Sequence, residues 1–244
     1  MAGVLFTLPS CSLSNVDNGG SYSDIPLISS VTCDYDNSLL SISYSTYGYV
    51  SGYSIVKDGI LTDTVKVEYS SSFIRLTRTT GGATKVMDFY YDSNNNEALT
   101  MQIGSNTIMR FNYNSSSYLS EEILNSTGNP LVEYEYNSGA ISNVTQYNSS
   151  HEQISSDDLY DYDVTLSYKT AGLACLNILY NTYNNYQPVL TFLGIGGYIP
   201  GSFSGIEGRY SNFTYNIDGY LTGLTMTVDD DPYSVTFTYK KIGS

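Results

Sequence analysis

The segment Phe213-Thr214-Tyr215-Asn216-Ile217-Asp218-Gly219-Tyr220-Leu221 contains the pattern that decides the fold of this chain. An aromatic residue, one further residue and a tyrosine end an extended run, a polar turn follows, and an apolar residue opens the next run. The same unit recurs at Phe89–Asp92, Phe111–Asn114 and Tyr134–Asn137. The tyrosines at positions 91, 113 and 136 lie 22 and 23 residues apart, which is the length of one β-hairpin. The sequence therefore predicts consecutive hairpins.

The runs between these turns alternate between apolar and polar residues with a period of two. In Thr64–Tyr69, one face carries Val and Tyr and the other carries Thr, Lys and Glu, and the same holds for Leu224–Val228 and Tyr233–Tyr239. Tight turns rich in Gly and Asp, such as Lys57–Ile60 and Thr80–Ala83, separate the runs. We expect an all-β fold with few helices: a long antiparallel up-and-down meander that forms a curled sheet or a partly closed β-barrel.

One interval breaks the regular spacing of the repeats. The tyrosines at positions 168 and 215 lie 47 residues apart, about two units, so one copy has been lost there by drift or insertion. Within this interval, Gly194–Gly208 is rich in glycine and is expected to form a long loop or bulged hairpin. Because long loops on rigid scaffolds often bind ligands, we expect a ligand at Tyr198, Phe203 and Tyr210.

The composition narrows the classes of partner. The chain has 26 Tyr, 8 Phe and no Trp, and Tyr combines a ring that packs with a hydroxyl that hydrogen-bonds. The formal net charge of −14 repels a phosphate backbone, so nucleic acid is not an expected partner. Exposed tyrosines would suit a glycan ligand, although Tyr at the inward strand positions is more simply explained as core.

The N-terminal residues predict the compartment. Leu8-Pro9-Ser10-Cys11 resembles the lipobox of bacterial lipoproteins. The resemblance implies that residues 1–11 are a signal remnant ending in the lipidated Cys11, which would anchor the protein at the outer membrane or cell surface, on the periplasmic or extracellular face. The alternative is an ordinary buried N-terminal strand. Residues 12–30 read as a flexible tether and residues 31–244 as a single repeat-built β domain. Cys33 and Cys175 either pair or remain two buried thiols.

The repeats also carry a family resemblance. The units resemble the YD repeats of Rhs and teneurin-type proteins, whose sheets spiral into shells. Together with the lipobox and the short chain, the whole mature region resembles the uncharacterised lipoprotein families of Bacteroides-type gut anaerobes, domains of unknown function with a porin-like fold. The resemblance implies an architecture and a compartment, and it supplies no catalytic residues.

Candidate catalytic chemistry is sparse. The single His, His151, lies in a loop-like stretch and is expected to be solvated. Carboxylates at Asp157, Asp161 and Asp163 could contribute oxygen ligands to a metal such as calcium, but a solvated turn explains them more simply. No cofactor is expected.

Three functions remain open at this stage. We expect a non-catalytic envelope protein, a binding or scaffold module for a glycan or a peptide. The first alternative is a hydrolase acting on glycans through carboxylates such as Asp157 or Asp161. The second alternative is a small outer-membrane porin. Against a porin, one face of the strands would have to present residues such as Lys66, Glu68 and Thr225 to lipid or to a wide channel.

Overall fold

The structure, a computed structural model, describes residues 26–167, 169–181, 185–198 and 201–241. The N-terminal half of the fold is made of β1 (Leu27–Cys33), β2 (Ser38–Tyr44), β3 (Val50–Lys57), β4 (Ile60–Tyr69), β5 (Phe73–Thr80), β6 (Ala83–Asp92), β7 (Glu97–Ile103), β8 (Asn106–Tyr113) and β9 (Leu119–Leu124). The remainder contains β10 (Pro130–Asn137), β11 (Ala140–Tyr147), β12 (Gln153–Asp158), β13 (Tyr160–Thr165), α1 (Gly172–Leu179), α2 (Gln187–Leu193), β14 (Ser202–Gly205), β15 (Tyr210–Tyr215), β16 (Leu221–Val228) and β17 (Asp231–Lys240).

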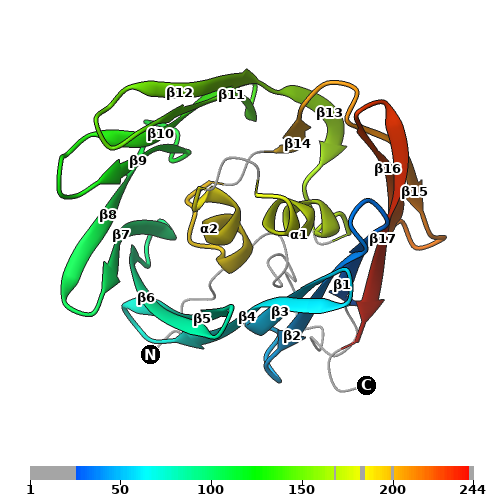
Figure 1. The fold of residues 1–244 in the computed structure, drawn as a ribbon, viewed down its shortest axis with the longest axis horizontal. Coiled ribbons are helices and arrows are strands. Elements are labelled where there is room, and N and C mark those ends of the chain that lie inside the picture. Colours follow the sequence, from blue (N-terminus) through cyan, green and yellow to red (C-terminus); the bar gives the residue numbers. More distant parts are fainter. Residues whose placement is uncertain (1–25, 168, 182–184, 199–200, 242–244) are drawn as a thin grey trace.

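The described strands form one curled antiparallel sheet and one small pair, so the predicted all-β meander is confirmed. Fifteen strands are hydrogen-bonded in the order β12 to β1 and then β17, β16 and β15. The β1–β17 pairing joins the first and last described strands, with Val31 opposite Phe237. The sheet does not close, because β12 and β15 are not paired with each other. The β13–β14 pair lies between them, and we call this region the seam (Figure 1).

The alternation along the strands separates a dry interior from a polar exterior. In β4, Val65 and Val67 are buried, whereas the alternate residues Lys66 and Glu68 are exposed. The outward positions of neighbouring strands also carry charge, because Arg75 of β5 forms an ion pair of 2.7 Å with Asp88 of β6. The predicted faces are therefore correct: the apolar face points inward and the charged face outward.

Each repeat tyrosine closes a strand at the same end of the barrel. The hydroxyl of Tyr136 donates a hydrogen bond of 2.7 Å to the carbonyl of Leu119, and the Tyr239 hydroxyl donates one of 2.8 Å to the carbonyl of Leu221. In both cases the ring reaches across the sheet to the start of a preceding strand. In these two units the hydroxyl satisfies a backbone carbonyl where the ladder ends, which Phe could not do.

The Asn that follows the tyrosine folds the loop. The Asn216 side-chain oxygen accepts hydrogen bonds from the backbone N–H groups of Asp218 and Tyr220, at 3.0 and 2.9 Å. Gly219 in this loop has a φ of 81°, a left-handed conformation that glycine adopts without strain. Asn114 makes the same pair of contacts in the loop after β8. The repeat is therefore one hairpin plus one Asn-nucleated loop.

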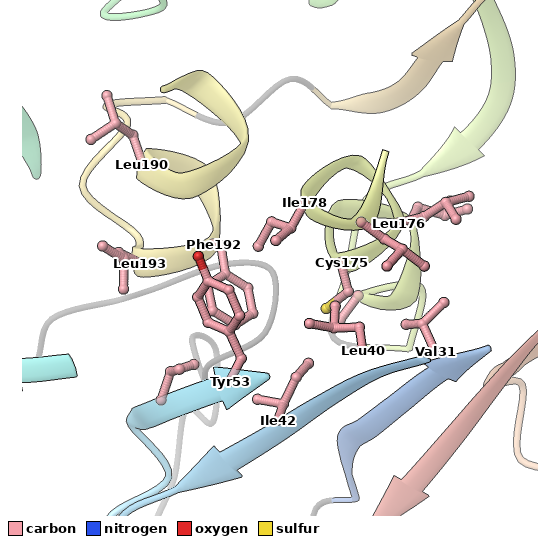
Figure 2. Close-up of a cluster of buried hydrophobic side chains, with 14 of the residues drawn as sticks. Val31, Leu40, Ile42, Tyr53, Cys175, Leu176, Ile178, Leu190, Phe192 and Leu193 are labelled. Carbon is pink, nitrogen blue, oxygen red and sulfur yellow. The ribbon is translucent and has the colours of Figure 1, made fainter. Parts of the chain in front are cut away.

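Two short helices fill the interior of the barrel. Seven of the eight residues of α1 are buried, and it lies beside α2 inside the ring of strands (Figure 1). Figure 2 shows Phe192 of α2 against Tyr53 of β3, where the two rings are edge to face with centroids 5.6 Å apart. Cys175 and Leu176 of α1 lie near Val31 of β1 and Leu40 of β2 (Figure 2). The interior is thus an apolar core.

The helices also account for the irregular repeat interval. Both lie in the connection between β13 and β14, so the 47-residue spacing reflects an insertion that enters the barrel at the seam. No helix in the described ranges is both long and apolar enough to cross a membrane.

β1 begins at Leu27, so residues 27–30, predicted as the end of the tether, are in a strand. Cys11 and most of the predicted tether lie outside the described residues. Cys33 and Cys175 are buried and form no disulfide with each other.

Candidate functional site

A cleft opens on the inner side of the seam, where the helices meet the β13–β14 pair. Its apolar wall is formed by Ile141 and Val144 of β11 together with Leu159, and its aromatic wall by Tyr134 and Tyr210. It encloses about 70 Å³, and a neighbouring cavity of about 40 Å³ shares five of its lining residues. We call the two together the seam cleft.

Polar atoms without partners gather in this cleft. In the described part of the chain, four buried side-chain polar atoms have no hydrogen-bond partner, and three of them belong to residues that line the cleft: Asn185 Oδ1, Ser204 Oγ and Arg209 Nε. Asn185 is only 7% exposed. Because a buried polar atom without a partner costs about 1–3 kcal/mol, native proteins rarely keep several together. The cleft is therefore suited to a polar ligand or to ordered water.

The cleft is connected to a buried carboxylate. Glu122 of β9 is 1% exposed and accepts hydrogen bonds from the backbone N–H groups of Tyr186 and Gln187, at 2.9 and 2.8 Å, where α2 begins. The Tyr134 hydroxyl donates a third, at 2.8 Å, and itself accepts one of 2.6 Å from Asn185 Nδ2. Burial raises the pKa of Glu122 to about 7, against the hydrogen bonds that favour its charged form.

Glu122 caps the start of α2. Its position at the start of α2 places a carboxylate at the positive end of the helix dipole, and it satisfies two backbone donors that have no intrahelical partner. Glu122 is not among the residues that line the seam cleft. It holds Tyr134, and through Tyr134 it orients Asn185, which does line the cleft.

The structure brings two of the three predicted ligand-binding residues together. Tyr210 lines the larger cavity and Phe203 the smaller one, and their rings are edge to face with centroids 5.3 Å apart. Tyr198 lies elsewhere, exposed at the barrel end. Its ring is edge to face with that of Tyr118, and the two ring centroids are 6.3 Å apart. The region predicted as one long loop is in fact divided: Gly194 caps α2 with a φ of 72°, and β14 follows.

The candidate metal ligands do not form a described site. Asp161 and Asp163 are exposed on β13, and the Asp161 carboxylate accepts a hydrogen bond of 2.8 Å from the Asp163 backbone N–H. Asp157 lies on β12, and none of the three lines the seam cleft. Among the described residues, no group of three or more His, Cys, Asp or Glu side chains is arranged to hold a metal ion. His151 stacks on Tyr147 in a surface loop.

The sequence analysis predicted neither the polar residues Asn185, Ser204 and Arg209 of the cleft nor Glu122 behind it. One signal was available, since Arg209 directly precedes Tyr210 and the chain has only 10 Lys and Arg against 24 Asp and Glu. Within the described ranges, Arg209 takes part in no salt bridge, and its guanidinium lies 5.9 Å from the centre of the Tyr210 ring.

The up-and-down strand order and the curled antiparallel sheet belong to the porin-like fold class. Among solved structures, a porin-like protein from Bacteroides uniformis is similar, with a TM-score of 0.52 and 15% sequence identity over 87% of this chain and 98% of that chain. At that identity the similarity establishes the fold alone. No family model and no curated protein matches the sequence.

Proposed function

We propose that this protein is a non-catalytic binding module of the cell envelope, anchored by lipid at Cys11, that takes a small polar ligand into the seam cleft. The observation that carries the proposal is the group of three buried polar atoms without partners around one cavity. Among the other described residues only one buried side-chain polar atom, Asn96 Oδ1, has no hydrogen-bond partner, so the cleft is where such atoms gather.

The lining suggests the chemistry of the ligand. The Arg209 guanidinium and the Ser204 hydroxyl can donate hydrogen bonds to a carboxylate, and a guanidinium matches a carboxylate in geometry and charge. Asn185 Oδ1 accepts, so the ligand also needs a hydroxyl or N–H donor. A carboxylate beside such a donor occurs at the end of a peptide and in an acidic sugar. The adjacent rings of Tyr210 and Phe203 supply an apolar contact surface.

Replacing Arg209 with glutamine should weaken binding of such a ligand by about tenfold or more, because a hydrogen bond to a charged group contributes about 1.5–3 kcal/mol. The measurement is isothermal titration of the purified protein with two probe sets, short peptides with free carboxyl termini and uronic acids. The set that binds identifies the class of ligand.

Arg110→Gln is the matched control. Arg110 lies on the outer face of β8 and is exposed, and the substitution changes the net charge by the same amount. It should leave the affinity unchanged. Equal loss in both variants, or no binding by either probe set, would contradict the proposed site.

Replacing Cys11 with serine should abolish lipid labelling of the protein and release it from the membrane fraction. The expectation rests on the lipobox-like Leu8-Pro9-Ser10-Cys11, in which only the thiol can be acylated. Metabolic labelling with radioactive palmitate, followed by fractionation, measures both effects. Cys33→Ser should keep the label, and a labelled Cys11→Ser protein would refute the anchor.

The two alternatives have less support. A hydrolase would require carboxylates that can reach a bound substrate, whereas Asp161 is exposed and bonded to its own strand and Glu122 is enclosed by donors. A porin requires an open polar lumen and an apolar outer band. In this chain α1 and α2 occupy the lumen, and Lys66, Glu68 and Arg75 lie on the outer face.

A further inference from the structure

A second pocket lies at the end of the barrel where the repeat tyrosines are found. It encloses about 330 Å³ between the ends of β2, β4 and β6 and the last turn of α2. It shares no lining residue with the seam cleft. We call it the rim pocket.

The rim pocket has aromatic walls and an apolar floor. Tyr49 and Tyr69 lie with ring centroids 5.5 Å apart at 44°, and they are 37% and 39% exposed. The third wall, Tyr91, is held in place by its hydroxyl, which donates a hydrogen bond of 3.3 Å to the carbonyl of Ser70. Ile74 and Leu193 are buried beneath them. Large rings that remain partly exposed around a concave, apolar floor are suited to a ligand with a flat apolar face.

Polar groups without partners surround this apolar surface. Among the described residues, the hydroxyls of Tyr49, Tyr69, Ser70 and Ser71 have no hydrogen-bond partner in the protein. Asn96 also lines the pocket, and its Oδ1 is the fourth buried polar atom without a partner. Burial raises the pKa of Tyr69, so its hydroxyl remains a hydrogen-bond donor at physiological pH.

The lining excludes two kinds of ligand. No charged side chain is among the residues that line the rim pocket, so an ionic ligand would have no counter-charge. A purely apolar ligand would cover Asn96 Oδ1 and the free hydroxyls without pairing them, which is unfavourable. The remaining chemistry is an uncharged molecule with one apolar face and several hydroxyls.

We propose that the rim pocket binds a neutral pyranose residue of a glycan, with the sugar ring stacked on Tyr49 and Tyr69 and its hydroxyls bonded to Asn96 and the serines. A volume of about 330 Å³ lies at the small end of the range of ligand pockets, which fits one sugar ring and its first neighbour. The site is independent of the seam cleft and goes beyond the function proposed for it.

The test is binding of the full protein to an array of neutral and acidic glycans, followed by titration with the neutral sugar that scores highest. Tyr49→Ala and Tyr69→Ala should each lower the affinity by about tenfold, because each removes one stacking face. The loop should keep its conformation in Tyr49→Ala, because the backbone of residue 49 makes the hydrogen bonds that close it. The Tyr49 N–H donates to Ser45 Oγ, and the Tyr49 carbonyl accepts a hydrogen bond from the Ser45 N–H.

Two controls make the result specific. Tyr47→Ala removes a 76% exposed ring from the same loop that does not line the pocket, and it should leave the affinity unchanged. Arg209→Gln, which alters the seam cleft, should also leave it unchanged. Binding of acidic glycans alone, binding of no neutral sugar at millimolar concentration, or equal losses in Tyr47→Ala and Tyr49→Ala would overturn the proposal.

Discussion

Replacing Glu122 with alanine is expected to destabilise the folded protein by about 3–5 kcal/mol. The substitution leaves the backbone N–H groups of Tyr186 and Gln187 and the hydroxyl of Tyr134 without their common acceptor in a buried site. It also removes the cap that fixes the start of α2 against β9. Urea unfolding followed by circular dichroism at pH 7 measures the loss.

Glu122→Gln distinguishes the hydrogen-bonding role of Glu122 from its charge, because Gln keeps a side-chain oxygen that accepts hydrogen bonds but does not ionise. Burial raises the pKa of Glu122 to about 7 from 4.5, so the protonated form is favoured by folding. Its contribution to the free energy of unfolding is fully present below about pH 4.5 and is lost as the pH rises through about 7. Wild-type stability should therefore fall by up to about 3 kcal/mol more than that of Glu122→Gln between pH 4.5 and 8. If the free energies of unfolding of the wild type and of Glu122→Gln changed in parallel over this pH range, Glu122 would have an ordinary pKa and the expectation would be wrong.

The hairpins were predictable because their signal is local. Alternation places Val65 and Val67 inside, and the Tyr-Asn pair at positions 215 and 216 ends one strand and folds the loop to the next. Each of these features is decided by residues within one hairpin, so a periodic pattern is enough to reveal it. The repeat spacing also located the insertion between β13 and β14.

The helices and the cap were not predictable because their signal is not local. α2 has seven residues, Gln187–Leu193, which is too short for a helical period to be distinguished from an apolar strand. Glu122 follows Glu121 in a strand, and nothing in the sequence indicates that one of these carboxylates meets a helix that starts 65 residues later. The seam cleft depends on both features. Its residues come from six helices and strands and the loops between them, and they converge only in the folded chain.

Replacing Phe192 with alanine is expected to destabilise the protein by about 3–5 kcal/mol. Phe192 is fully buried between α2 and the strands, and its ring packs edge to face on Tyr53 of β3 (Figure 2). Truncation leaves a cavity in the middle of the barrel that neither the helix nor the sheet can fill without moving. The change in the urea midpoint, at unchanged slope, measures the loss.

This variant also distinguishes a packed core from a removable plug. If α1 and α2 are part of the core, their packing with the sheet supplies much of the stability, and Val189→Ala, at a half-buried position of the same helix, should cost less than Phe192→Ala. If the helices instead were a plug that leaves an open channel, Phe192→Ala would cost less than about 1 kcal/mol and would increase ion conductance in planar bilayers. The buried apolar contacts of both helices favour the first outcome, because a channel emptied of α1 and α2 would expose Leu40 and Tyr53 to water.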